Sequence, residues 1–164
     1  MIAVSYITDT SLIDEMCEIE QTSFPTPWSR EDIVTDITEH DFSRYLGIFE
    51  DGTLIGWGCV WLRPAERVEV LLATVSIRPD KRRMGYGRAL MNALIQASAD
   101  GGGEYIELQC RTRNTVAQKL YESLGFLRVG KRKGYYTDTG DDAYIYVKIN
   151  LPEGHPENDP KLRS

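Results

Sequence analysis

The chain has 164 residues and a formal net charge of −6. This length suffices for one domain to bury a core without disulfides or metals, and the acidic balance argues against a nucleic-acid partner, because neutralising phosphates needs a concentrated basic face. No stretch approaches the roughly 20 apolar residues of a membrane helix and the start shows no secretory signal, so we expect a cytoplasmic protein without a membrane partner. The 3 cysteines have neither disulfide nor zinc spacing, so we expect reduced, buried thiols and no metal.

Two amphipathic helices are expected near the N-terminus. Residues 11–14 resemble a capping box, and apolar residues follow them at helical spacing. The two prolines of segment 24–28 interrupt this helix and place an aromatic loop after it. A second helix then starts after Ser29 and carries Ile33 and Ile37 on one side.

The rest of the domain alternates strands with two further helices. A turn at Asp51 and Gly52 divides the first apolar run into a hairpin. Strands are expected at 45–49, 54–61, 68–77, 105–110, 126–129 and 143–149, and helices at 89–97, ending before Gly101, and at 114–123. This order predicts an α/β (α+β) fold with a mixed sheet. The domain covers residues 1–151, and the polar tail 152–164 is expected to be disordered.

A basic, glycine-containing loop, residues 82–87, stands between the strand at 68–77 and the next helix. Its sequence is Arg-Arg-Met-Gly-Tyr-Gly, and Lys81 and Arg88 flank it. Glycines let backbone N–H groups approach a phosphate, while the helix N-terminus and the arginines add positive potential. We therefore interpret the loop as an anion site. The alternative is a turn whose glycines only supply unusual backbone angles.

Two common nucleotide motifs fit this loop poorly. A P-loop would end in Gly-Lys-Ser or Gly-Lys-Thr, but Arg88 and Ala89 follow Gly87. A dinucleotide-binding fold would need a third glycine and an acidic residue about 20 positions on, at the end of the next strand. Gln109 and Cys110 stand there instead.

Two blocks of the sequence resemble the GNAT acetyltransferases. Residues 77–90 are similar to the family's motif A, and residues 108–126 are similar to its motif B. The resemblance implies an acetyl-CoA-dependent N-acetyltransferase with a mixed, strongly twisted sheet, in which two central parallel strands splay apart to admit the pantetheine arm. It covers about residues 7–151.

Shorter segments resemble one branch of that family. Phe24-Pro25 with Trp28-Ser29, and Gly134-Tyr135-Tyr136 with the segment 141–144, look like the enzymes that acetylate protein N-termini, including the RimI-type and Ard1-type enzymes. The partner implied is a protein N-terminus, with the N-terminal alanine of a ribosomal protein as one candidate.

The resemblance also implies which residues bind the cofactor. Val75, Ser76 and Ile77 offer backbone groups to the acetyl and pantetheine portions, as an added strand would. The pyrophosphate lies in the loop, and Asn114 contacts the cofactor arm; Asn114 could equally be a plain helix N-cap. The residues implied to contact acetyl-CoA are Val75, Ser76, Ile77, Arg82, Arg83, Met84, Gly85, Tyr86, Gly87, Arg88 and Asn114.

Three residues are candidates for catalysis. Tyr121 matches the family tyrosine that points at the thioester sulfur, where a phenol of pKa about 10 can protonate the thiolate. Packing against neighbours is the alternative for this side chain. Gln109 stands where many relatives carry a glutamate that acts as general base, and glutamine cannot accept that proton. Glu107 shares its strand face, so we expect Gln109 to position a relaying water and Glu107 to assist at most modestly. The alternative for Glu107 is an exposed strand residue with no part in catalysis.

Aromatic side chains from two loops are candidates for holding the substrate. Phe24, Pro25 and Trp28 could face Tyr135 and Tyr136 across a cleft, since aromatics bury area while offering a polar tip. Ordinary packing is the alternative.

Three functions remain open on these residues. The first is acetylation of a protein α-amine, the second is acetylation of a lysine or a small amine, and the third is non-catalytic binding of acetyl-CoA. The complete loop and Tyr121 favour catalysis over binding alone.

Overall fold

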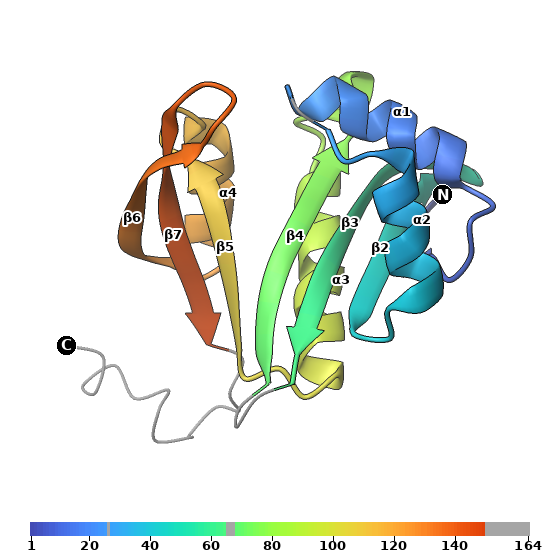
Figure 1. Ribbon diagram of the computed structural model, residues 1–164. Coiled ribbons are helices and arrows are strands. Elements are labelled where there is room, and N and C mark those ends of the chain that lie inside the picture. Colours follow the sequence, from blue (N-terminus) through green and yellow to red (C-terminus); the bar gives the residue numbers. More distant parts are fainter. Residues whose placement is uncertain (26, 65–67, 150–164) are drawn as a thin grey trace.

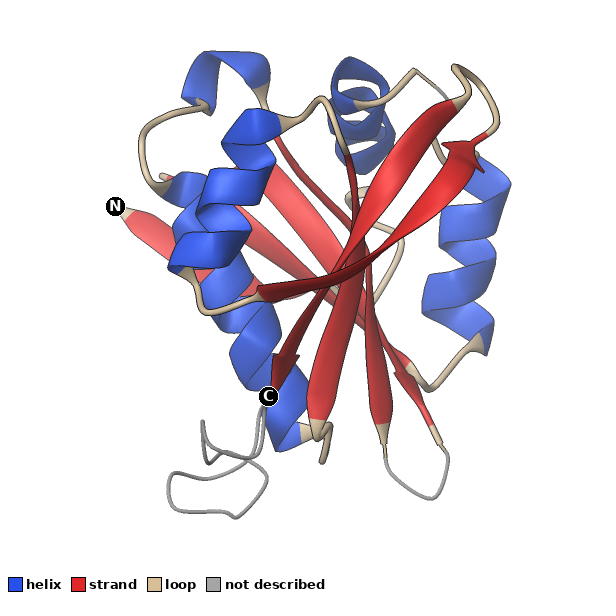
Figure 2. Cartoon of the chain, turned by 90° about the vertical axis from the view of Figure 1, so that its left-hand side faces the viewer, coloured by secondary structure: helices blue, strands red, loops and turns tan. Residues whose placement is uncertain are grey.

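The computed structural model describes residues 1–25, 27–64 and 68–149 of the chain. Over these residues it shows a seven-stranded mixed sheet with α-helices on both of its faces (Figures 1 and 2). The strands are β1 Ile2–Tyr6, β2 Ser43–Glu50, β3 Thr53–Arg63, β4 Glu69–Ile77, β5 Tyr105–Arg111, β6 Leu127–Tyr136 and β7 Asp141–Ile149. The helices are α1 Ile13–Ser23, α2 Arg30–Glu39, α3 Tyr86–Asp100 and α4 Thr115–Ser123, with a 3₁₀ turn at Pro79–Lys81. The expected tail 152–164 lies outside the described residues.

The strand order is β1-β2-β3-β4-β5-β7-β6, and all neighbours are antiparallel except β4 and β5. The hairpin turn at Asp51 and Gly52 lies where expected, with Gly52 at a φ of 84°. Ser29 caps α2 by accepting a hydrogen bond from the Asp32 N–H at 3.1 Å, which confirms the predicted start of this helix.

Three local expectations were wrong. The cap of α1 is Leu12 without a side-chain bond, while the Ser11 hydroxyl donates to Asp9 at 2.6 Å, so no capping box forms. β1, an edge strand with mostly exposed residues, pairs with β2 and was not predicted. β6 was expected to end at Val129, whereas pairing with β7 extends the strand to Tyr136.

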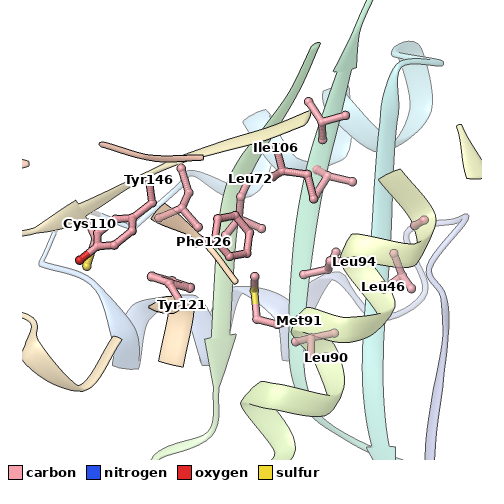
Figure 3. Packing of buried hydrophobic residues seen from close by; sticks show 14 of the residues in the cluster. Leu46, Leu72, Leu90, Met91, Leu94, Ile106, Cys110, Tyr121, Phe126 and Tyr146 are labelled. Atoms are coloured by element: carbon pink, nitrogen blue, oxygen red, sulfur yellow. The ribbon is translucent and has the colours of Figure 1, made fainter. Parts of the chain in front are cut away.

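Each face of the sheet carries its own apolar cluster. On one face α3 and α4 cover residues of β2 to β5 and β7, with Leu90, Met91 and Leu94 of α3 packed on the strands (Figure 3). On the other face Met16 and Ile33, from α1 and α2, pack around the fully buried Trp57 of β3, whose indole N–H donates to the Met16 carbonyl at 2.9 Å.

The parallel strands β4 and β5 separate along their length. They pair only at Glu69–Tyr105, Val70–Ile106 and Leu71–Glu107, and beyond this point the described residues of β4 have no strand partner on that side. A bulge at Ala73, where β4 pairs with Cys59 and Val60, marks the divergence. Figure 1 shows the two strands spreading toward their C-terminal ends. The expected splayed sheet is therefore confirmed.

Candidate active site

The predicted anion loop leads directly into the N-terminus of α3. Gly85 precedes the helix with a φ of 86°, and Arg83 also has a positive φ, of 63°. No side chain caps α3, so the N–H groups of its first turn are left without intrahelical partners. A methyl group at Gly87 would lie 3.8 Å from Leu120, an ordinary contact. Crowding inside the protein therefore does not explain why these two positions are glycine. At both positions the missing side chain leaves the backbone open to a ligand.

The basic side chains of this loop have different partners. Lys81 pairs with Glu50 at 2.9 Å, and Arg88 donates to the Ser123 hydroxyl at 2.8 Å. Arg82 donates to the Ile77 carbonyl at 3.0 Å and also reaches the end of α1, so it fastens the loop to the fold. Arg83 is exposed and makes no hydrogen bond or ion pair within the described part of the chain. Its guanidinium is therefore the one most available to an anion.

The free edge of β4 lies beside this loop. Val75, Ser76 and Ile77 pair with β3 through Gly58, Trp57 and Gly56, and their opposite side is the one that β5 has left. A bound chain could therefore hydrogen-bond to this backbone as an added strand does. The Ser76 hydroxyl is buried and has no hydrogen-bond partner of good geometry among the described residues.

The carboxyl group of Glu20 lies buried next to this strand and was not among the predicted site residues. Glu20 of α1 is 1% exposed, and the Thr74 hydroxyl donates to it at 3.3 Å. Burial raises the pKa of Glu20, while the backbone N–H of Trp28 and the hydroxyls of Thr74 and Ser76 oppose the rise. Glu20 thus joins the loop after α1 to β4. Its place on the apolar side of α1, next to Ile19, was the available signal.

On β5 the two predicted catalytic polar residues are in contact. Glu107 and Gln109 lie on the same, half-buried face, and the Gln109 amide donates to the Glu107 carboxylate at 3.0 Å. The expectation that they share a face is confirmed. The bond leaves one proton-accepting group, the Glu107 carboxylate, held beside an amide at the place where β4 and β5 separate.

Tyr121 lies on α4, inside the cluster on the α3 face. It is 8% exposed, and its ring packs against Phe126 and Tyr146 at centroid distances of 5.9 and 6.2 Å, next to Cys110 (Figure 3). The hydroxyl makes no hydrogen bond within the described residues. Burial, with smaller effects of Cys110 and Tyr136, raises the pKa of the phenol, so the group stays protonated and keeps an O–H that it can donate.

Asn114 caps the same helix. Its side-chain oxygen accepts from the Ala117 N–H at 3.1 Å, so the N-cap interpretation is confirmed. The amide nitrogen of this side chain is not used by the cap and remains free to contact a cofactor.

The aromatic candidates divide into packed and accessible rings. Trp28 stacks on Trp61 at 5.5 Å and meets Trp57 edge-on at 6.3 Å, so its ring belongs to the core on the α1 face. Phe24 is half-buried and Pro25 exposed at the end of α1. Tyr135 is 43% exposed, and its ring meets that of Tyr136 edge-on at 5.0 Å. The β6–β7 turn and α1 lie at the end of the sheet where β4 and β5 diverge (Figure 1).

Three further observations concern the expected absence of a metal and of a membrane span, and the expected burial of the thiols. The described residues contain no group of His, Cys, Asp and Glu side chains placed to hold a metal, and none of the helices in these residues has the length and hydropathy needed to cross a bilayer. All 3 cysteines are free; Cys59 and Cys110 are buried, whereas Cys17 is only half-buried, which corrects the expectation of buried thiols at that position.

Comparisons with known proteins agree with this geometry. Residues 13–126 match the Acetyltransferase (GNAT) family. The chain is 32% identical over 139 residues to a putative [ribosomal protein bS18]-alanine N-acetyltransferase of Bacillus subtilis. The aligned residues cover 84% of this chain and 90% of the relative. It is 31% identical over 141 residues to the [ribosomal protein bS18]-alanine N-acetyltransferase of Escherichia coli, with the same coverage. The crystal structure of the Escherichia coli ribosomal-protein-S18-alanine N-acetyltransferase superposes with a TM-score of 0.83 at 27% identity, over 95% of this chain and 98% of that one.

Proposed function

Because the chain belongs to the acetyltransferase (GNAT) family, we propose that it transfers the acetyl group of acetyl-CoA to the α-amine of a protein N-terminus. One observation carries the proposal. The unpaired edge of β4 ends at Ile77, and the uncapped N-terminus of α3 follows at Tyr86, so a strand-like arm and its anionic end would have adjacent places. A cytoplasmic location follows if the acceptor is a ribosomal protein.

The residues of the loop and of β4 fit acetyl-CoA. The N–H groups at the start of α3 and the side chain of Arg83 can hold the pyrophosphate, since a helix N-terminus favours anions. The backbone of Val75 to Ile77 can hold the pantetheine arm and the acetyl carbonyl. Arg82 acts indirectly, because its guanidinium is used to fix the loop.

The groups on β5 suit an acceptor whose ammonium form loses its proton easily. An α-amine has a pKa of about 7.7 to 8.0, whereas that of lysine is about 10.4, a gap equal to about 3.4 kcal/mol of deprotonation cost. The Glu107 carboxylate, held by Gln109, can attract the ammonium form and accept its proton through water. This arrangement favours α-amines over lysines, because it lacks a second carboxylate at Gln109.

Tyr121 supplies the proton donor on the other side of the reacting centre. Its raised pKa makes full transfer to a thiolate of pKa about 8.5 unfavourable, so we propose that it stabilises the leaving sulfur by a hydrogen bond. Asn114 positions the cofactor arm with its free amide nitrogen.

The acceptor that we propose is the N-terminal alanine of a ribosomal protein, because relatives that cover most of the chain carry that name. The test is turnover with acetyl-CoA on matched peptides that begin with Ala, Ser or Met, each made with and without an internal lysine. Mass spectrometry then locates the acetyl group. Acetylation only at internal lysines would refute the proposal, and binding of acetyl-CoA without turnover on any peptide would indicate a binding module.

A further inference from the structure

Arg111 ends β5, and its side chain spans to the turn between β6 and β7. It follows Gln109 on the same strand face and is 20% exposed. Its two terminal nitrogens reach Asp138 at 2.9 and 3.1 Å, Thr139 at 2.8 Å and Asp141 at 3.3 Å. One side chain of β5 therefore contacts two residues of the turn and the first residue of β7.

The flat face of the same guanidinium covers an aromatic ring. The Arg111 Cζ atom lies 3.9 Å from the centroid of Tyr136, which in turn meets Tyr135. Arginine can serve both contacts at once, because its edge matches a carboxylate in a bidentate arrangement while its face stacks on a ring. A lysine ammonium is a point charge and cannot reproduce this geometry.

The turn depends on such an anchor because the ladder beside it is broken. Between β6 and β7 the register passes from Arg132–Ala143 directly to Tyr136–Asp141, so the residues between them in β6 lack regular strand pairing. Residues 137–140 are exposed. The other hydrogen bonds of this segment lie within the hairpin itself. They include one from the Gly134 N–H to the Asp142 carboxylate at 2.8 Å and one from the Gly140 N–H to the Tyr136 carbonyl at 2.7 Å.

The charges are consistent with a preformed clamp. Burial acts to raise the pKa of Asp138, but the hydrogen bonds from Arg111 and from the Thr139 backbone N–H, together with the charge of the guanidinium, lower that pKa overall, so the carboxylate stays charged against Arg111. Arg113 also pairs with Asp141, at 2.7 Å, but its side chain is 78% exposed and it makes no contact with Tyr136 among the described residues. An exposed pair of this kind contributes little.

We propose that Arg111 is a positioning residue for the acceptor: it clamps the β6–β7 turn and the ring of Tyr136 at the splayed end of β4 and β5, and thereby sets the affinity for the acceptor peptide. The inference rests on the proposed function, since Tyr135, which is exposed, and Tyr136, which holds its ring, are the residues expected to contact the acceptor. It assigns no part to Arg111 in binding acetyl-CoA.

The test compares Arg111→Lys and Arg111→Ala with Arg113→Ala, a matched loss of positive charge two residues away. With an N-terminal alanine peptide, kcat/KM should fall about 10- to 100-fold in both Arg111 variants, because a small misplacement of positioning groups has effects of this size. The loss should appear mainly as a higher KM for the peptide, with the Kd for acetyl-CoA within about twofold of wild type. Arg113→Ala should stay within about twofold in every constant. An unchanged peptide KM in Arg111→Ala, or a weakened acetyl-CoA Kd, would overturn the inference.

A second measurement separates the clamp from the proposed function. Amide hydrogen exchange over residues 134–141 should be at least about tenfold faster in Arg111→Lys, which keeps the aliphatic stem, and unchanged in Arg113→Ala. If wild type acetylates no peptide N-terminus but this difference is found, the proposed function fails and the clamp stands. Equal exchange in wild type and Arg111→Lys refutes the clamp whatever the acceptor is.

Discussion

Replacing Gln109 with glutamate should give the enzyme a stronger base and a pH-dependent loss of stability. In the wild type the Gln109 amide donates to the Glu107 carboxylate at 3.0 Å. Gln109→Glu removes this donor and places two carboxylates at about the same separation. Two like charges this close cannot both ionise freely, so they hold a shared proton to higher pH.

The size of the effect follows from the distance. Two unit charges 3.0 Å apart repel by about 1.4 kcal/mol in water and by about 5.5 kcal/mol at the effective dielectric constant of a protein surface. The half-buried site lies between these limits. The pKa of the introduced carboxyl should therefore rise from its usual value of about 4.3 toward neutrality, which suits a general base.

The activity assay is a single-turnover pH profile on an alanine peptide. The α-amine has an ordinary pKa of about 7.7 to 8.0, so it is mostly charged at about pH 6 to 7 and mostly neutral at about pH 8.5. Gln109→Glu should therefore raise the rate more at the lower pH than at the higher pH. The control is Glu107→Gln combined with Gln109→Glu, which keeps one carboxylate and removes the repulsion.

Stability provides the second readout. Because folding raises the pKa of the introduced carboxyl, the variant should match wild type below about pH 4 and lose roughly 1 to 5 kcal/mol of unfolding free energy as pH rises through the raised value. Urea denaturation at several pH values measures this. Equal stability of variant and wild type at about pH 8, or a rate gain that does not depend on pH with chemistry rate-limiting, would refute the reasoning.

Three further predictions concern the loop, the proton donor and the core. Gly85→Val should weaken acetyl-CoA binding in calorimetry by at least about tenfold, because a β-branched residue is strained at a φ of 86°. The control is Gly102→Val, which has a φ of 83° but lies away from the site, so it should show similar strain with unchanged affinity. Tyr121→Phe should keep acetyl-CoA affinity and slow single turnover about 10²-fold; an unchanged rate would reduce Tyr121 to packing. Asp36→Ala should cost about 2 to 4 kcal/mol at pH 7 in urea denaturation, because Ser43, Tyr45 and Trp61 all donate to this buried carboxylate. Burial opposes ionisation of Asp36, but these bonds lower its pKa, so the deficit should shrink as pH falls below about 4; a deficit independent of pH would contradict the charge assignment.

The sequence predicted the parts of the site that are local in the chain. The anion loop was readable because Gly85, the arginines and the start of α3 follow one another within a few residues. The helix caps at Ser29 and Asn114 were readable for the same reason. The splay of β4 and β5 came only from the family resemblance, since no pattern within either strand reports where its neighbour departs.

What the sequence did not predict depends on contacts between distant segments. The position of Glu20 on the apolar side of α1 indicates burial, but its partner Thr74 lies 54 residues away and could not be read from the helix. Arg111 was part of a recognised motif, but its partners lie 27 to 30 residues further on, across a turn. β1 is short and mostly exposed, so it exists because β2 supplies hydrogen bonds, not because of its own pattern.

The sparse pairing of β4 and β5 also decides what holds the two parts of the sheet together. Three residue pairs are all the strand pairing that joins β1–β4 to β5–β7 in the described part of the chain, and they lie at one end of the two strands. The two parts are therefore held together mainly by the apolar cluster that the helices α3 and α4 form with strands of both. A ligand that binds the free edge of β4 in the folded protein only, and not in the unfolded chain, adds its binding free energy to the stability of the fold, so the unfolding temperature should rise with the concentration of that ligand.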